Sequence, residues 1–564
     1  MHVIHASEVK PLLRNLKFLI NISSHRNEPV FDNKNKKIIN SKTSKPRSSM
    51  KVRFCCLIMA LLFSYCSTPE NKAIVDTETS ALSEGKLLMK RYCQSCHMLP
   101  DPKLLSKNIW QNDVLPEMAW YFGLFRDPSG NYVKMPSYVY EELSYMKNVP
   151  KNQLLTADQF AKIVNYISSH AGMSKTQAPK IFKPLTQFTA FTPAQDIPIP
   201  GVTLVKIIDQ HLIVANASDS SINVTSITNQ KAVESFMVGY PIHIERSDDR
   251  YNITYMGTFS PLDDSTGFMC QAKLEKQRFI KIDTLLTKLK RPVHSLMHDI
   301  NTDGQKDIII SEFGSNVGSF IYYKNLGKNK FKKITLNPYP GSVISYIVDY
   351  NTDNLPDIIN LMGQGDEGIN VYINNGDDTF HRKEIISFPP TYGSTYFELV
   401  DFNGDKLPDI LYANGDNGDY PLNPPELRNY HGVRIFLNKG NFKFQEALFI
   451  PINGVYKAMA YDFDLDGDLD ICSVSHFADY YHSPQEGFVY LENNGELQFT
   501  QYSFSESKNA HWMTLDIGDV DHDGDTDIVL GAALSGIDIA PPEINALWEH
   551  KNIGYTVLKN NLKH

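Results

Sequence analysis

The amino-acid sequence predicts a multidomain fold, in which a small all-α domain precedes a larger all-β domain built from repeated units. Three observations predict it. A short aspartate-rich segment recurs five times in the C-terminal half, and its spacing of 50 to 61 residues is typical of propellers and solenoids. A Cys-x-x-Cys-His segment lies between two stretches with the apolar spacing of helices. A proline-rich linker, residues 174–200, separates the two parts.

The bulk composition is that of a folded, soluble protein. The chain has 564 residues, of which 42% are hydrophobic and 21% are charged, so it can form two or more domains with sizeable cores. The net charge of -9 is modest for this length and gives no reason to expect a nucleic acid as partner.

Residues 50–66 have the features of a signal peptide. Lys51 and Arg53 precede a short apolar stretch that ends at Cys66 and is shorter than the roughly 20 residues that span a bilayer. A cysteine at this position is typical of a bacterial lipoprotein, in which Cys66 would become the acylated N-terminus. A soluble exported form and an uncleaved anchor are the alternatives. We expect a periplasmic or cell-surface protein, an outer-membrane lipoprotein of a Gram-negative bacterium, that meets the membrane only through its lipid.

Residues 1–49 are polar and basic and do not resemble the start of an exported protein. Because a signal peptide should begin the chain, we predict that translation starts at Met50 and that residues 1–49 are a non-translated or disordered extension. A cytoplasmic tail ahead of a membrane anchor is the alternative.

Residues 75–173 are predicted to hold one covalent haem c. In Cys93-Gln94-Ser95-Cys96-His97 two thiols can add to the vinyl groups of a porphyrin, and the adjacent histidine can face the iron. An amphipathic helix is predicted just before the motif, and a second is predicted after a Thr156 cap, with Phe160, Ile163, Val164 and Ile167 on one face. A chance occurrence or a redox dithiol is the alternative.

This order of helix, motif and closing helix resembles the monohaem cytochrome c domain. The resemblance implies that His97 is the proximal ligand of the iron and that a methionine is the distal ligand. Met118 is the favoured candidate because its segment, Trp110 to Met118, resembles the W-x-x-x-V-x-x-x-M stretch of related bacterial domains. Met135, which precedes a proline, is the alternative, and Met146 is a third option. A thioether ligand would raise the haem potential and favour one-electron transfer.

Residues 201–555 contain the five repeats. They read DINTDGQKDI, DYNTDNLPDI, DFNGDKLPDI, DFDLDGDLDI and DVDHDGDTDI, and each offers oxygen side chains at positions 1, 3, 5 and 9. Calcium prefers such oxygen ligands, so up to five Ca²⁺ ions are predicted, with position 7 contributing a backbone carbonyl. The predicted ligands are Asp299, Asn301, Asp303, Asp307, Asp349, Asn351, Asp353, Asp357, Asp401, Asn403, Asp405, Asp409, Asp462, Asp464, Asp466, Asp470, Asp519, Asp521, Asp523 and Asp527.

The loops join strands rather than helices, because an EF-hand glutamate at position 12 is missing and β-branched runs follow. They resemble the FG-GAP or VCBS repeats of integrin-like β-propellers. Two earlier stretches with strand-like alternation, Val202 to Val238 and Ile242 to Ile282, bring the expected number of blades to seven. Asn354 and Lys406 replace the loop glycine, so the second and third loops are expected to bind calcium weakly. The last two loops, which have aspartate at all four ligand positions, are expected to bind it best.

Three functions are compatible with this organisation. The first is an exported electron carrier whose propeller docks an unknown redox partner protein or a ligand. The second is a dehydrogenase that passes substrate electrons to its own haem, and the third is a surface binding or adhesion module with a tethered cytochrome. No Gly-x-Ser-x-Gly elbow, P-loop or dinucleotide fingerprint occurs in the propeller, so its catalytic residues are unknown. Its aromatic loops could bind a carbohydrate or another small molecule.

Overall fold

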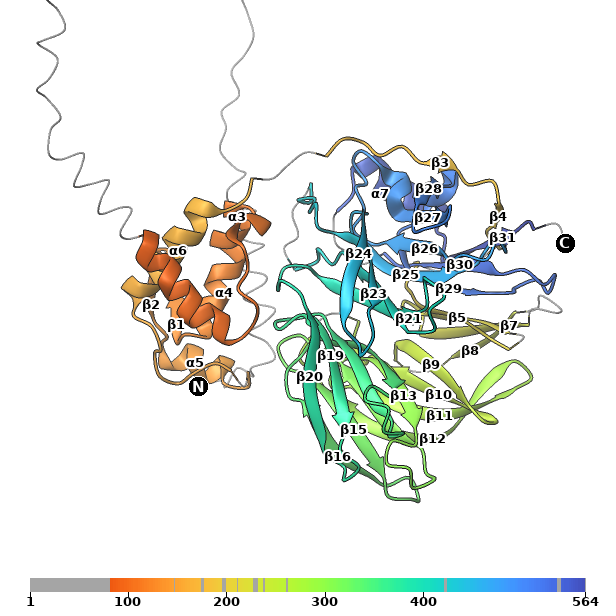
Figure 1. Ribbon diagram of the computed structural model, residues 1–564, viewed down its shortest axis with the longest axis horizontal. Helices are drawn as coiled ribbons and strands as arrows, with labels where there is room; N and C mark the ends of the chain where they lie inside the picture. Colours follow the sequence, from red (N-terminus) through yellow and green to blue (C-terminus); the bar gives the residue numbers. More distant parts are fainter. Residues whose placement is uncertain are drawn as a thin grey trace, which may run out of the picture.

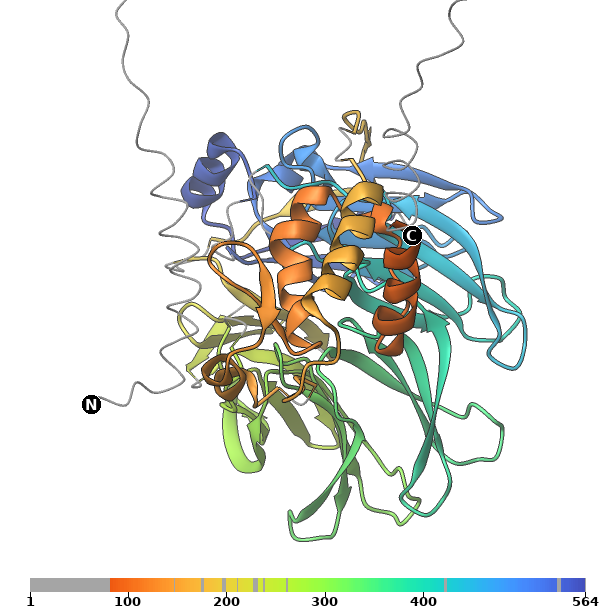
Figure 2. The same cartoon turned by 90° about the vertical axis from the view of Figure 1, so that its left-hand side faces the viewer.

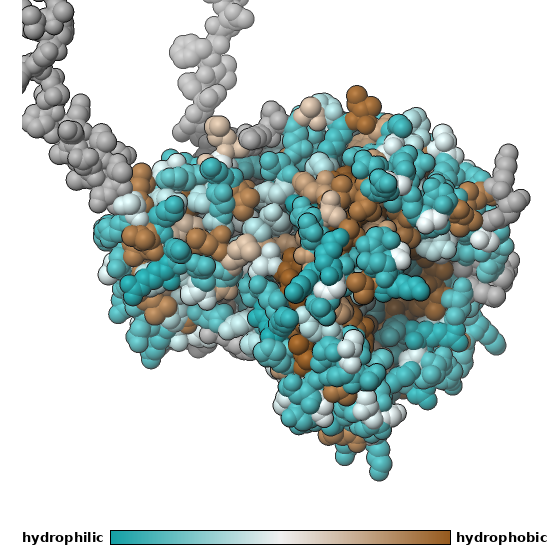
Figure 3. All heavy atoms as spheres, in the orientation of Figure 1, coloured by the Kyte–Doolittle hydropathy of each residue, from teal (hydrophilic) through white to brown (hydrophobic). Residues whose placement is uncertain are grey.

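The computed structural model shows a helical domain beside a β-propeller (Figure 1). It describes residues 82–146, 148–173, 177–194, 199–209, 211–226, 232–236, 239–259, 262–419, 424–534 and 539–562. The predicted extension, the signal peptide and Cys66 lie outside these ranges. Among the described helices, none combines the length and the apolar character that a membrane crossing needs. The face seen in Figure 3 is mainly hydrophilic, and its hydrophobic side chains gather mostly in the hollows of the propeller.

The helical domain is made of short helices around one cluster of buried side chains. A helix over residues 82–92 comes first and runs into the cysteine motif. The other helical elements are η2 (Cys93–Ser95), η3 (Pro102–Leu104), α3 (Lys107–Ile109), η4 (Trp110–Val114), α4 (Leu115–Trp120), α5 (Ser137–Leu143) and α6 (Ala157–His170).

Helix α6 begins where the sequence predicts. The Thr156 hydroxyl accepts a hydrogen bond from the Gln159 backbone amide, and the Gln159 side-chain oxygen accepts one from the Thr156 backbone amide, which forms a capping box. The helix crosses the first one at Gly85, where an added Cβ would lie 2.3 Å from the Lys162 carbonyl oxygen. Glycine is therefore required for this close approach of the first and last helices.

The predicted all-α domain also contains a small sheet. Strands β1 (Leu124–Arg126) and β2 (Tyr132–Lys134) pair antiparallel. Asp127 closes the turn between them by accepting hydrogen bonds from the Gly130 and Asn131 amides, at 2.9 Å each. The Asp-Pro-Ser-Gly sequence of this turn was the available signal for a hairpin.

Seven four-stranded antiparallel blades form the propeller within the described residues, which confirms the predicted number. Blade 1 consists of β5 (Val202–Ile208), β6 (His211–Asn216), β7 (Ser221–Ser226) and β8 (Ala232–Phe236), and blade 2 of β9 (Pro241–Ser247), β10 (Arg250–Tyr255), β11 (Gly267–Glu275) and β12 (Arg278–Leu289). Blade 3 consists of β13 (Pro292–His298), β14 (Asp307–Glu312), β15 (Ser319–Asn325) and β16 (Phe331–Asn337). Blade 4 consists of β17 (Ser342–Val348), β18 (Asp357–Met362), β19 (Gly368–Asn374) and β20 (Phe380–Ser387).

The remaining three blades follow the same order along the chain. They are β21 (Ser394–Val400), β22 (Asp409–Asn414), β23 (Gly432–Asn438) and β24 (Phe444–Pro451); β25 (Val455–Tyr461), β26 (Asp470–Ser475), β27 (Phe488–Asn493) and β28 (Phe499–Ser503); and β29 (Trp512–Gly518), β30 (Asp527–Ala532), β31 (Tyr555–Asn560) and β4 (Phe188–Phe191). The propeller thus continues five residues beyond the predicted end at 555.

The second strand of each late blade is buried over its whole length. Strands β14, β18, β22, β26 and β30 have every residue buried, because neighbouring blades cover both faces of the sheet. This burial explains why the segments after the aspartate loops read as continuous apolar runs rather than as alternating ones.

Part of the predicted linker belongs to the propeller. Strand β4 is the outermost strand of the last blade and pairs antiparallel with β31, and β3 (Lys183–Pro184) adds a fifth, parallel strand to the blade before it. Each of these short strands pairs with a segment more than 300 residues away, so local sequence periodicity could not reveal them. Because β4 precedes the first blade in the chain, it closes the ring.

The inner strand of each blade is a sheet edge that faces the central axis. Carboxylates of one blade accept hydrogen bonds from amides of the next inner strand in three places. These are Glu245 with the Met297 amide at 3.1 Å, Glu398 with the Ala460 amide at 3.2 Å, and Asp516 with the Ile207 amide at 2.8 Å. These backbone amides lie on a sheet edge, and the carboxylate of the neighbouring blade gives each of them a hydrogen-bond acceptor.

The helical domain lies against one face of the propeller, as Figures 1 and 2 both show. The Tyr145 hydroxyl donates to Asp263 at 3.1 Å, and the Tyr430 hydroxyl donates to the Leu104 carbonyl at 3.3 Å. Asp263 and Tyr430 lie on loops between second and third strands. The aspartate loops join first and second strands, which places them on the opposite face in antiparallel blades.

Candidate functional site

The cysteine motif lies at the edge of the helical core. Cys93 and His97 are half-buried, and Cys96 is exposed. The His97 Nδ1 lies 2.8 Å from the Met98 carbonyl oxygen, which can only accept, so Nδ1 carries the proton. This hydrogen bond leaves Nε2 with its lone pair free to bind a metal.

The environment of Cys93 differs from that of a reactive dithiol. Burial, followed by the neighbouring Cys96, raises the pKa of the Cys93 thiol to about 12. Catalytic dithiols instead have a lowered cysteine pKa, which supplies a thiolate near neutral pH. The environment of Cys93 therefore disfavours the redox-dithiol alternative.

The surroundings of the motif fit a porphyrin. Cys93, Leu88, Tyr92, Leu99 and Met118 are all partly buried and pack on the same core cluster, which contains Trp110 and Phe160. Two thiols, an imidazole nitrogen and a thioether are the groups that a covalent haem c uses.

The three candidate methionines fall into two groups. Met118 lies on α4 and packs against the cluster that includes Cys93. Met135 and Met146 are buried in a second cluster with Val139 and Val149. This arrangement favours Met118, although its role as distal ligand stays a prediction.

The five aspartate loops share one backbone conformation. The residues at positions 4 and 6 have positive φ in every loop, including Asn354 at 65° and Lys406 at 68°. The amide at position 6 donates to the first aspartate in every loop, at 2.7 to 3.2 Å. Asn354 and Lys406 therefore retain the glycine conformation, at a cost of about 1 kcal/mol each.

The aspartate at position 9 fastens the loop to its blade. In each repeat one oxygen accepts from the amide at position 2, and the other accepts from the amide of an asparagine that ends the third strand. These asparagines, which the sequence analysis missed, are Asn325, Asn374, Asn438, Asn493 and Asn560. In the first four the signal was an Asn-x-Gly pattern shortly before a phenylalanine.

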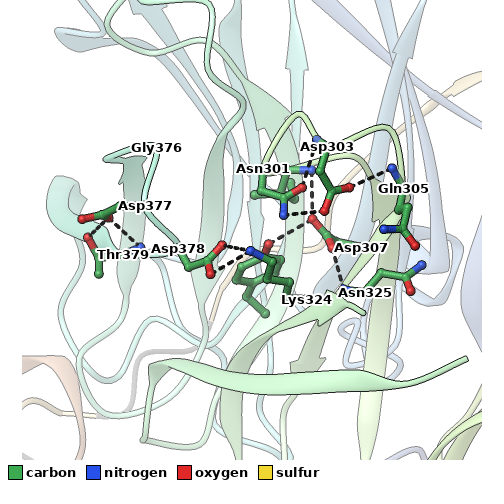
Figure 4. Close-up of polar contacts among 12 residues, drawn as sticks. Asn301, Asp303, Gln305, Asp307, Lys324, Asn325, Gly376, Asp377, Asp378 and Thr379 are labelled. Atoms are coloured by element: carbon green, nitrogen blue, oxygen red, sulfur yellow. Dashed lines mark hydrogen bonds and ion pairs between the residues drawn. The ribbon is translucent and has the colours of Figure 1, made fainter. Parts of the chain in front are cut away.

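The first loop satisfies its own polar groups, as Figure 4 shows. The Asn301 amide donates to Asp303 at 2.9 Å, and the Gln305 backbone amide donates to the other Asp303 oxygen at 2.9 Å. The second loop repeats the contact between Asn351 and Asp353 at 2.7 Å. In these two loops the asparagine side-chain amide donates to a carboxylate oxygen that a cation would otherwise bind.

The last two loops have carboxylate oxygens without partners. In one, ligand oxygens of Asp462, Asp464 and Asp466 lie within 4.8 Å of one another, and in the other those of Asp519, Asp521 and Asp527 do. Buried oxygens with no hydrogen-bond partner among the described residues occur on Asp462, Asp468, Asp521 and Asp525. Asp468 and Asp525 occupy position 7, where the sequence analysis expected only a backbone carbonyl.

Mutual repulsion adds to this excess of acceptors. Burial raises the pKa of Asp464, and the charges of Asp466 and Asp462 raise it further. Burial likewise raises the pKa of Asp525, with Asp523 and Asp521 as neighbouring charges. A divalent cation would remove the repulsion and satisfy the unpaired oxygens, so the geometry of the last two loops fits calcium.

The aromatic loops considered for ligand binding are mostly buried. Tyr480 is buried and packs edge-on against Trp548, with ring centroids 4.8 Å apart. His476, His511 and Trp548 stack in a row, at centroid distances of 3.8 and 4.6 Å. Most of these rings therefore support the core rather than an accessible binding surface.

Comparison with known proteins identifies the repeats. The FG-GAP-like repeat family matches residues 349–412 and 462–530, which include the last four aspartate loops. No curated protein matches the chain.

Solved structures that match include a Lactobacillus plantarum protein, with 11% identity over 60% of this chain and 88% of that one and a TM-score of 0.35. A computationally designed protein, Ika8, matches with 8% identity over 64% and 96%, and a TM-score of 0.36. The N-terminal domain of Nup159 matches with 10% identity over 68% and 99%, and a TM-score of 0.38.

Proposed function

We propose that this protein is an exported haem c electron-transfer protein whose calcium-stabilised propeller docks a partner or ligand. One observation carries the proposal. Cys93 and Met118 pack on the same hydrophobic cluster, and the His97 Nδ1 donates to the Met98 carbonyl, which leaves Nε2 free. These groups are a complete set for attaching and ligating one haem.

The residues of the chain have separate tasks in this proposal. Cys93 and Cys96 would hold the haem covalently, and His97 Nε2 and the Met118 thioether would be the ligands of its iron. Leu88 and Leu99, which pack on the same cluster as Cys93, would help to exclude water from it. A bound haem would supply a one-electron couple, and a thioether ligand would raise its potential.

The proposed calcium ions have a structural task. They would occupy the last two loops first, where the unpaired carboxylate oxygens lie. These loops are on the propeller face opposite the helical domain, so calcium would stabilise the blades without taking part in electron transfer. Export, lipidation at Cys66 and the choice of redox partner remain proposals from the sequence.

The haem proposal is tested by absorbance of the full-length protein exported from a host that matures cytochromes c. Wild-type protein is expected to show covalently bound haem with a reducible spectrum, and Cys93→Ser is expected to lose the two-thioether attachment. Cys472→Ala changes a buried cysteine in β26 and is expected to retain the haem. Purified wild-type protein without haem absorbance would refute the proposal.

The same preparation separates a carrier from a dehydrogenase. Oxidised protein is mixed with candidate sugars and alcohols, and separately with a small reduced cytochrome. Rapid exchange with the cytochrome and no reduction by any substrate is expected of a carrier. Substrate-dependent haem reduction would favour the dehydrogenase alternative.

A further inference from the structure

One lysine contacts the fifth aspartate loop, residues 519–527. The Lys559 Nζ donates to the Asp521 Oδ2 at 3.0 Å, and both side chains of this ion pair are less than one third exposed. The other carboxylate oxygen of Asp521 is buried and has no hydrogen-bond partner among the described residues. Asp521 therefore has one cationic partner already, whereas its second oxygen is unused.

The position of Lys559 follows from the fold of the repeat. Lys559 precedes Asn560 in β31, and the Asn560 amide donates to Asp527 of the same loop at 2.8 Å. The Lys559 Nζ also lies 5.8 Å from the centroid of the Phe191 ring on β4, a distance at which a cation and an aromatic face attract each other. The strand and the ring therefore keep the ammonium group beside the loop.

The other repeats have different contacts at this position. The residues before the asparagine that ends the third strand are, in the first four repeats, Lys324, Ile373, Leu437 and Glu492. Lys324 pairs with Asp378 of the next blade rather than with its own loop. Among the ion pairs of the described residues, only the one of Lys559 involves a predicted calcium ligand.

The fourth and fifth loops are otherwise closely matched. The fourth loop, residues 462–470, and the fifth loop each have aspartate at positions 1, 3, 5, 7 and 9. The affinity of an oxygen-ligand loop for calcium depends on the charge of its ligands. A calcium ion that used Asp521 would share one carboxylate with the Lys559 ammonium group, and the two positive charges would repel each other.

We propose that Lys559 determines the calcium affinity of the fifth loop and makes it weaker than that of the fourth. Lys559 offsets one negative charge of the fifth loop, and no lysine or arginine forms an ion pair with the fourth loop within the described residues. Calcium would then occupy the fourth loop first and the fifth loop only at a higher concentration. This inference rests on the calcium sites of the proposed function and is independent of the haem.

The test is calorimetric titration of calcium into full-length protein from which metal has been removed. Asp464→Ala removes the fourth site and Asp521→Ala the fifth, so each variant reports the affinity of the other loop. The fourth loop is expected to bind calcium about tenfold more tightly than the fifth. Lys559→Met, combined with Asp464→Ala, is expected to raise the affinity of the fifth loop about tenfold, because the repulsion is lost.

Three further variants separate charge from packing. Lys559→Arg keeps the positive charge and is expected to retain the weak binding of the fifth loop. Lys559→Gln removes the charge with a different side chain, so it decides the matter if Lys559→Met fails to fold. Lys107→Met, which removes an exposed lysine of the helical domain, is expected to leave the affinities of both loops unchanged.

Two results would overturn the proposal, and they are distinguishable. Equal affinities of the two loops, unchanged by Lys559→Met, would refute the role of Lys559 and leave the calcium sites in place. No calcium binding by either loop would refute the calcium sites of the proposed function and this inference with them.

Discussion

A buried carboxyl group is expected to make the stability of this propeller depend on pH. Glu367 precedes β19, is 3% exposed, and accepts hydrogen bonds from the Ser394 amide at 3.0 Å and the Ser394 hydroxyl at 2.7 Å. Burial raises the pKa of this carboxyl group to about 8 despite these bonds. The group is therefore largely protonated in the folded protein at neutral pH.

The pH dependence of stability follows from this raised pKa. An unfolded glutamate, with a pKa near 4.5, loses its proton first, so between about pH 5 and 8 the folded state binds more protons. The free energy of unfolding then falls as pH rises, by about 1.4 kcal/mol per pH unit for this one group. Glu367→Gln is expected to reduce the slope of urea-unfolding stability between pH 6 and 8. Glu384→Gln, on the exposed edge of β20, is the control, and equal slopes in wild type and Glu367→Gln would contradict the prediction.

At the scale of elements, the five aspartate loops share one backbone conformation but differ in the side chains at position 3. In all five loops the position 6 amide donates to the first aspartate, and the position 9 aspartate accepts from backbone amides. In the first two loops the side-chain amide of the position 3 asparagine donates to the position 5 aspartate. In the last two loops aspartate replaces this asparagine, which leaves oxygens for a cation.

Calcium removal is expected to lower the melting temperature through the last two loops. A site held at a hundredfold its Kd would contribute about 2.7 kcal/mol. Asp464→Ala and Asp521→Ala are each expected to reduce the bound calcium by one ion per chain, measured by elemental analysis, and to reduce the stabilisation by added calcium.

Asp353→Ala is the matched control, because the Asn351 amide already occupies that carboxylate. It is expected to leave most of the calcium content and the calcium-dependent shift in place. Identical melting temperatures for wild type with and without metal would show that the loops are simple turns.

The contacts between blades are a second feature of the elements. Lys324 at the end of β15 forms an ion pair with Asp378 of the next blade at 2.7 and 2.8 Å, as Figure 4 shows. Both side chains are about one quarter exposed, so the pair is worth at most about 1 kcal/mol. Packing of apolar strand faces, rather than such pairs, holds neighbouring blades together.

At the scale of the whole molecule, ring closure depends on the segment that follows the helical domain. Strand β4 protects the edge of β31, and its Phe188 packs against Phe463 and Tyr490 with ring centroids 5.8 and 5.5 Å away. An unprotected β31 would be a long sheet edge open to other chains. The helical domain and the propeller are therefore joined by a structural strand as well as by a linker.

Phe188→Ala in the full-length chain is expected to destabilise the propeller by about 3 to 5 kcal/mol, since it leaves a cavity between blades 6 and 7. Urea unfolding followed by tryptophan fluorescence measures this loss. Phe191→Ala, in the same strand but half-exposed, is the control. A chain that begins at residue 177 is expected to fold, whereas one that begins at residue 199 is expected to aggregate. Equal stability of the two shortened chains would contradict the closing role of β4.

Much of the fold was predictable because it depends on local repetition. The aspartate loops recur at regular spacing, each followed by an apolar run, and this pattern predicted five blades. Strand-like alternation in the two stretches before them predicted the other two. Thr156 and the face around Phe160 predicted α6 for a similar local reason. The hairpin of β1 and β2 and the strand β4 were missed, because one depended on a turn inside a helical region and the other on pairing across most of the chain.

The sequence by itself determined the chemistry available to this protein: two thiols beside a histidine, five oxygen-rich loops and a ring of repeated strands. These features depend on residues close together in the chain. Only the tertiary structure decided which groups lack partners and which meet. It placed Met118 on the cluster against which Cys93 packs, and it left unpaired oxygens in the last two loops. Burial and ring closure set these outcomes, and both depend on contacts that no local pattern records.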